Sequence, residues 1–185
     1  MKTTNYAVEI VNELHRSVEQ IADSDAETFA DIIMQSDKVF VAGAGRSGLI
    51  GRAFAMRLMH VGINAYVVGD TITPGIDKDD VLIIGTGSGE TRSLIPMARK
   101  AKSLGASVTT VTITPASTIG SLADAVVKLP GLPKDQASGD HSTIQPMASL
   151  FEQTLLIFYE AIILRLMEKT GLDSSRMYGR HANLE

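Results

Sequence analysis

Two loops rich in glycine and hydroxyl side chains carry residue types suited to holding a phosphate group. The first spans residues 43–48 (Gly-Ala-Gly-Arg-Ser-Gly) and the second spans residues 85–91 (Gly-Thr-Gly-Ser-Gly-Glu-Thr). Each loop lies between an apolar run and a stretch with helical periodicity. Backbone N–H groups at the start of a helix lack internal partners and carry partial positive charge. The sequence therefore predicts a site for phosphate and sugar hydroxyls formed by Arg46, Ser47, Thr86, Gly87, Ser88, Gly89, Glu90 and Thr91.

Each loop alone has other interpretations. The first matches the G-x-G-x-x-G spacing of dinucleotide-binding folds, and Asp70 lies about where such folds place an acidic residue. A dinucleotide site does not require the second loop, however. The hydroxyl residues could also simply cap helices, but two such loops in one unit favour a ligand site. Neither loop contains the Gly-Lys-Ser or Gly-Lys-Thr of ATPases.

The surrounding pattern alternates short apolar runs with helical stretches. Because the runs lack polar alternation, they are typical of parallel strands covered on both faces. We therefore predict an α/β fold with three αβα layers and about five parallel strands, in which both loops face one crevice at the carboxyl edge of the sheet. The predicted strands are residues 38–43, 65–68, 81–84, 107–113 and 125–129, and the predicted helices between them are residues 46–61 and 91–104.

The whole chain of 185 residues is predicted to form one domain. Its final helix is apolar almost all round and needs burial against more than one neighbour, so we expect a homo-oligomer, either a dimer or a tetramer. The predicted parts are N-terminal helices over 1–36, a core over 38–130, a loop over 131–145, a long helix over 146–169 and a tail over 170–185.

Composition narrows the possible functions. The net charge of −4 argues against nucleic-acid binding, and the absence of cysteine excludes disulfides, thiolate metal sites and a cysteine nucleophile. The start of the chain does not resemble a secretion signal, so we expect a cytoplasmic protein without membrane contact. The serines and histidines do not follow the order of a hydrolase triad. No metal site is predicted, because the histidines lack paired spacing: His15, His60, His141 and His181.

The two loops resemble the signature loops of SIS (sugar isomerase) domains, and the resemblance covers roughly residues 39–166. Thr86 stands where those loops commonly have serine, which keeps the hydroxyl. Within the family, the chain is similar from end to end to the 6-phospho-3-hexuloisomerases. The segments that carry this closer resemblance are residues 52–60, 70–74, 149–153 and 180–185.

The resemblance implies a reaction and its catalytic residues. The reaction interconverts D-arabino-hex-3-ulose 6-phosphate and D-fructose 6-phosphate through an enediolate, without a cofactor. Glu152, which lies in an otherwise apolar helix, is the implied base; the alternative is a surface carboxylate near a helix start. His60 could move a proton between the sugar oxygens, or could simply lie at a helix end.

Several other residues have more than one possible role. Glu90 could cap a helix or bind a sugar hydroxyl, and Arg46 could pair with the phosphate or face solvent. His181 could belong to a disordered tail or close a neighbouring subunit's site. The resemblance also implies hexulose-phosphate synthase as a neighbour in the ribulose monophosphate route of formaldehyde fixation. Alternative functions are a sugar-phosphate-binding regulator and an isomerase of another phosphosugar.

Overall fold

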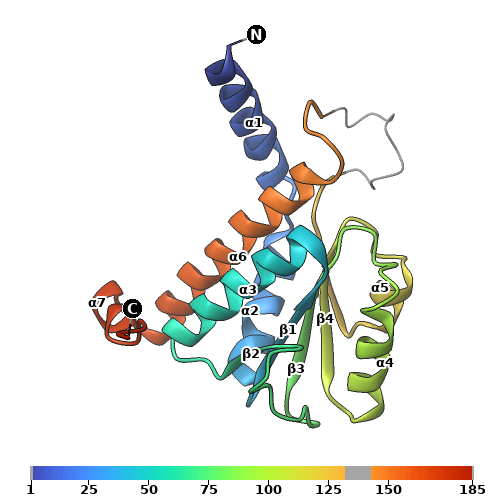
Figure 1. Cartoon of the computed structure of the whole chain (residues 1–185), viewed down its shortest axis with the longest axis vertical. Helices are drawn as coiled ribbons and strands as arrows, with labels where there is room; N and C mark the ends of the chain where they lie inside the picture. Colours follow the sequence, from blue (N-terminus) through green and yellow to red (C-terminus); the bar gives the residue numbers. More distant parts are fainter. Residues whose placement is uncertain (1, 132–142, 185) are drawn as a thin grey trace.

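A computed structural model describes residues 2–131 and 143–184 (Figure 1). Within these ranges the chain forms one five-stranded sheet in the order β2-β1-β3-β4-β5, and every neighbouring pair is parallel. The predicted α/β class and parallel sheet are confirmed. The strands are β1 (Val39–Gly43), β2 (Ala65–Val67), β3 (Val81–Gly85), β4 (Ser107–Thr112) and β5 (Ala125–Lys128).

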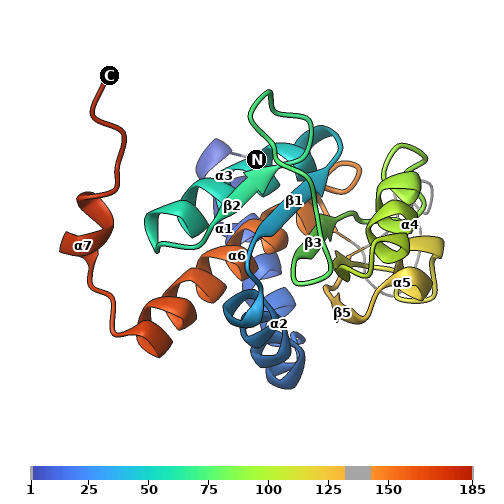
Figure 2. The same ribbon diagram turned by 90° about the horizontal axis from the view of Figure 1, so that it is seen from below.

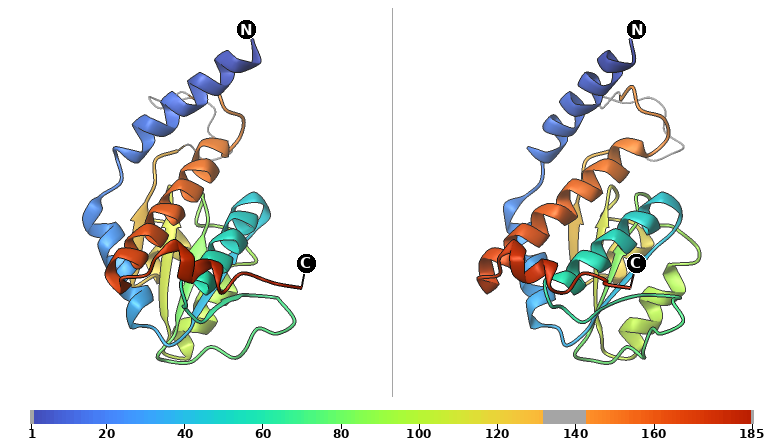
Figure 3. Two further views of the ribbon diagram at one scale, coloured as in Figure 1. Left: turned by 90° about the vertical axis from the view of Figure 1, so that its left-hand side faces the viewer. Right: turned by 60° about the vertical axis from the view of Figure 1, so that its left-hand side comes forward.

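Helices cover both faces of this sheet (Figures 1 and 2). One face carries α2 (Asp23–Gln35), α3 (Gly45–His60) and α6 (Ser149–Thr170), and the other carries α4 (Ile95–Ser103) and α5 (Thr118–Leu122). Two further helices lie outside these layers. The first, α1 (Thr3–Val18), packs on α6 and projects beyond the sheet, and α7 (Ser174–Tyr178) lies in the tail (Figure 3).

Strands β1 and β3 are apolar at successive positions because both of their faces are buried. In β1, Val39 and Val41 pack with α2, α3 and α6, whereas Phe40 and Ala42 point to the opposite face. This alternation follows from the two-residue period of a strand. Burial on both sides explains why the apolar runs identified the strands from the sequence.

Ring stacking fixes α3 against α6. The Phe54 and Tyr159 rings are 4.0 Å apart with an interplanar angle of 7°, and both residues are almost completely buried. A stacked aromatic pair adds about 0.5–1.5 kcal/mol beyond the burial of its surface. The first turns of the two helices are thereby held near the carboxyl edge of the sheet.

Several element boundaries differ from the predictions. Helix α4 begins at Ile95 rather than at residue 91, because residues 91–94 form turns, and α6 begins at Ser149 rather than at Pro146. The short helices α5 and α7 were not predicted. Most of the predicted loop 131–145 lies outside the described residues. None of the helices within the described ranges combines the length and apolar character needed to cross a membrane.

Candidate functional site

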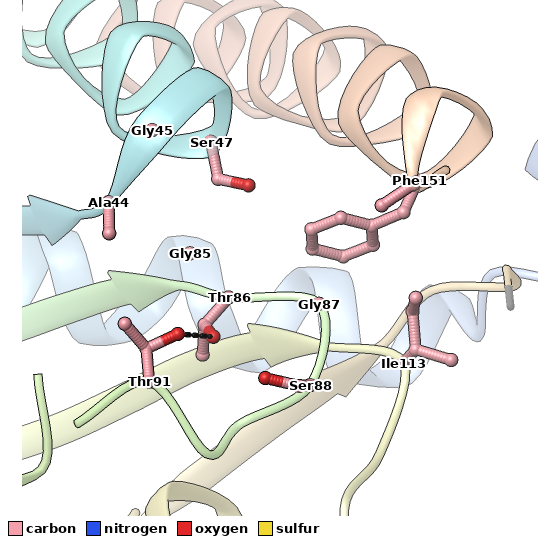
Figure 4. A pocket seen from close by; sticks show the side chains of 11 residues that line it. Ala44, Gly45, Ser47, Gly85, Thr86, Gly87, Ser88, Thr91, Ile113 and Phe151 are labelled. Atoms are coloured by element: carbon pink, nitrogen blue, oxygen red, sulfur yellow. Dashed lines mark hydrogen bonds between the residues drawn. The ribbon is translucent and has the colours of Figure 1, made fainter. Parts of the chain in front are cut away.

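The two glycine loops meet at one edge of the sheet. Gly43 at the end of β1 is in register with Gly85 at the end of β3. From β1 the chain turns to β2 on one side, and it later returns to β3 on the other side. Open α/β sheets bind ligands at such a switch point. A pocket of about 420 Å³ lies here, lined by Ala44, Gly45, Ser47, Gly85, Thr86, Gly87, Ser88, Thr91, Ile113, Ala148 and Phe151 (Figure 4).

The first loop turns sharply from β1 into α3. Gly43 and Gly48 approach so closely that a Cβ on Gly48 would lie 2.7 Å from the Gly43 carbonyl oxygen. This contact leaves no room for side chains and aims the start of α3 at the pocket. Ser47 lies in the first turn of that helix and lines the pocket. Its hydroxyl and the free N–H groups of the turn are suitable donors to a phosphate.

Hydrogen bonds hold the second loop in a fixed shape. The Thr86 and Thr91 hydroxyl oxygens are 3.2 Å apart, and the Gly89 N–H donates to Thr86 Oγ1 at 3.3 Å. The loop is also tied to the next strand, because the Thr112 hydroxyl donates to the Gly87 carbonyl at 3.0 Å. A preorganised loop of this kind can bind an anion without reordering on each binding event.

Glu90 caps a helix, which is one of the two roles left open by the sequence, but the helix is α5 and not the one that follows its own loop. Its carboxylate accepts a hydrogen bond from the Thr118 N–H at 2.6 Å, at the first residue of α5. This backbone hydrogen bond holds the pKa of Glu90 below its usual value. Of the predicted binding residues, the structure brings Ser47, Thr86, Gly87, Ser88 and Thr91 to the pocket lining, whereas Arg46, Gly89 and Glu90 lie outside it.

A buried carboxylate forms an ion pair with an arginine beside the pocket. Glu152 is in the first turn of α6 and is 4% exposed, and Arg46 Nε donates to its Oε2 at 2.5 Å. The Arg46 side chain is largely exposed. Arg46 therefore contacts the carboxylate that was expected to be the base, and in this structure it is the countercharge of that carboxylate. Since Ala148 and Phe151 line the pocket on the same turn of helix, the pair lies at the pocket's edge.

His60 lies at the far end of α3, about 22 Å from Gly45 at 1.5 Å per residue. It is buried, and its ring stacks on His181 of the tail at 5.3 Å. Burial, Arg57 and His181 all lower the pKa of His60. Within one chain, neither histidine reaches this pocket. The predicted proton transfer by His60 therefore does not fit the chain's own site.

Sequence reasoning missed the apolar wall of the pocket. Ile113 follows β4, and Ala148 and Phe151 lie at the start of α6. Apolar residues next to a strand or in an apolar helix are indistinguishable from core residues in a sequence. The only available signal was the position of Phe151 next to Glu152.

The model of the SIS domain family matches residues 32–163. The chain belongs to the SIS domain family. This SIS chain is 58% identical to the 3-hexulose-6-phosphate isomerase of Bacillus subtilis, with both chains covered completely. It is 41% identical to the Mycobacterium gastri enzyme of the same name, over 96% of this chain and 92% of that one.

A solved structure agrees with these relatives. It is a hypothetical protein of Methanococcus jannaschii whose crystal structure infers a molecular function of 3-hexulose-6-phosphate isomerase. It superposes on this SIS chain with a TM-score of 0.83 at 33% identity, covering 97% of this chain and 98% of the other.

Proposed function

We propose that this chain is a sugar-phosphate isomerase that interconverts 3-hexulose 6-phosphate and fructose 6-phosphate. The full-length identity of 58% to an enzyme of that name supports the substrate. The observation that carries the chemistry is the buried Glu152 carboxylate beside a pocket built from two anion-binding loops. A phosphate bound at Ser47 and the second loop leaves the sugar carbons free to extend toward α6.

The reaction moves a carbonyl from C3 to C2. Glu152 removes the proton from C2, whose acidity is increased by the C3 carbonyl, and the electron pair forms the enediolate. The protonated carboxyl group returns the proton to C3, while one proton passes from the C2 oxygen to the C3 oxygen. Atoms and charge balance in both directions, and one carboxylate can carry the carbon-bound proton both ways. The Arg46 guanidinium has donors besides the Nε–H that contacts Glu152, and these can bind an enediolate oxygen.

The proposal is tested with Glu152→Gln and a control on the same helix. Glu160→Gln removes an exposed carboxylate two turns further along α6. Turnover of hexulose 6-phosphate and binding of fructose 6-phosphate are measured for both variants and the parent. We expect Glu152→Gln to lose turnover by orders of magnitude while still binding the sugar phosphate, and Glu160→Gln to retain both. A parent protein that binds the ligand without turning it over would indicate a sugar-phosphate sensor instead.

The same proposal includes a homo-oligomer, either a dimer or a tetramer, in the cytoplasm. Large apolar side chains remain exposed on several helices of the single chain, including Val11 on α1, Leu49 on α3 and Leu164 on α6. A second copy could cover them. Light scattering on the purified protein tests this expectation, and a stable monomer would contradict it. From the family resemblance alone, we also propose that hexulose-phosphate synthase supplies the substrate.

A further inference from the structure

The projecting helix α1 carries a buried carboxylate that the proposed reaction does not use. Glu13 is 6% exposed and accepts three hydrogen bonds from the segment that precedes α6. The Thr143 hydroxyl donates at 2.6 Å, the Ile144 N–H at 2.8 Å and the Gln145 side-chain amide at 2.8 Å. Three donors converge on one carboxylate, so Glu13 binds this segment firmly.

The hydrogen bonds continue from that segment to the catalytic end of α6. Gln145 Oε1 accepts from the Gln153 side-chain amide at 2.5 Å. Gln153 directly follows Glu152 in the chain, and Ala148 and Phe151 of the pocket wall lie on the same turn. Glu13 is therefore connected to the turn that carries Glu152 through two glutamine side chains.

The start of α6 needs support from outside the helix. Among the described residues, Met147 is the one non-glycine residue with a positive φ, at 56°, and its side chain is 70% exposed. A residue held in this region is strained and persists where its surroundings enforce the conformation. The N-cap residue is Ala148, whose methyl group cannot accept a hydrogen bond from the first turn.

We propose that Glu13 is a positioning residue that sets the start of α6, and with it the Glu152 carboxylate, for proton transfer. The inference rests on the proposed role of Glu152. Glu13 acts through Gln145 and Gln153 and touches no substrate. In Glu13→Gln, an NH₂ group replaces one of the two carboxylate oxygens. This NH₂ group then faces a hydrogen-bond donor of the segment before α6, so that hydrogen bond is lost. If Gln145 turns its amide over to repair that contact, its NH₂ group then faces the Gln153 amide.

The first test compares Glu13→Gln with Glu9→Gln, which removes an exposed carboxylate one turn earlier on α1. We expect Glu13→Gln to lower kcat about 10- to 100-fold, because small misplacements of a catalytic group have effects of this size. KM and the Kd for inorganic phosphate should stay within about threefold, since β1 and β3 position the phosphate loops. Glu9→Gln should match the parent.

Glu152→Gln is measured in parallel to separate the two proposals. If Glu152→Gln is inactive while Glu13→Gln equals Glu9→Gln, the role of Glu13 is overturned and the proposed function stands. If Glu152→Gln retains turnover, the proposed function fails first. Equal losses of turnover and phosphate binding in Glu13→Gln would indicate a general structural defect and would also overturn the positioning role.

A second pair of variants tests whether turnover depends on the geometry at the start of α6, even if Glu13→Gln fails to fold. Met147→Gly accepts the left-handed backbone, whereas Met147→Val places a β-branched residue where it is least tolerated. We expect Met147→Val to lower kcat about tenfold or more, with phosphate binding retained, and Met147→Gly to keep the parent's turnover. Full turnover in Met147→Val would show that Glu152 does not depend on this geometry.

Discussion

Gly89 offers a direct test of how the second loop is built. Its φ is +65°, and a Cβ at this position would lie 1.8 Å from Ser117 Oγ and 2.4 Å from Ser117 Cβ. Gly89→Ala therefore combines an unfavourable backbone conformation with a steric overlap. The loop must move away from Ser117, which breaks the Gly89 N–H bond to Thr86 Oγ1.

The expected loss of folding stability in Gly89→Ala is the sum of three contributions. A left-handed alanine costs roughly 1–2 kcal/mol, and overpacking costs roughly 1–3 kcal/mol. The reduced entropy of the unfolded chain offsets about 0.4–1 kcal/mol. Gly89→Ala should therefore destabilise the folded protein by about 1–5 kcal/mol. Gly171→Ala is the matched control, because its φ is +64° and nothing lies within 4 Å of an added Cβ. The difference between the two variants isolates the overlap, at about 1–3 kcal/mol.

Urea unfolding measures the stability change, and binding of inorganic phosphate reports on the loop. Movement of Gly89 also breaks the bond from the Ile119 N–H to the Gly89 carbonyl. Losing these two loop hydrogen bonds at about 1 kcal/mol each corresponds to roughly a 30-fold weaker phosphate Kd. Adding Ser117→Gly to Gly89→Ala should recover part of the loss, although Ser117 also caps α5 through the Gly120 N–H. The reasoning is refuted if Gly89→Ala and Gly171→Ala are equally stable and phosphate binding is unchanged.

Three further predictions concern charge, packing and pH. Arg46→Gln removes the positive charge beside the enediolate and should lower kcat about 100-fold, with a smaller change in KM. Arg46→Lys keeps the charge and should recover part of the lost kcat, and steady-state kinetics measures both variants. Phe54→Ala should destabilise by about 3–5 kcal/mol in urea unfolding, and a loss below 1 kcal/mol would contradict the stacking argument. Hydrogen bonds from Arg165 and Lys169 lower the pKa of Glu27 from 4.5 to about 2. The ionised Glu27 therefore stabilises the folded protein, fully above about pH 4.5 and progressively less as the pH falls toward 2. If Glu27→Gln leaves the dependence of stability on pH unchanged over that range, this prediction is wrong.

The sequence was sufficient to predict the sheet and the loop edge, for a physical reason. Burial on both faces favours continuous apolar runs, so residues 81–84 stand out from the surrounding pattern, whereas β4 also buries the β-branched Thr109, Thr110 and Thr112. The glycine and hydroxyl loops followed from the donors that a phosphate needs. The parallel order then placed both loops at one edge.

The predictions that failed or stayed open depend on contacts between distant segments. A carboxylate in a loop can cap any nearby helix, and only the fold shows that Glu90 contacts Thr118 in α5. The position of His60 in α3 was clear from the sequence, but its distance from the pocket follows from the direction in which α3 runs. The pairing of Arg46 with Glu152 joins residues 106 positions apart, and no local pattern encodes it.

The pairing of Arg46 with Glu152 explains how a negatively charged enediolate can form beside a buried carboxylate. Moving an uncompensated charge into a poorly hydrated site is costly, so a buried base needs a countercharge. In the proposed reaction, proton transfer from C2 neutralises Glu152 and leaves the negative charge on the enediolate. Because Arg46 contacts Glu152 at 2.5 Å, the guanidinium is next to the charge before and after the transfer. The total charge around Arg46 stays constant, so the developing enediolate is stabilised without bringing in a new charged group.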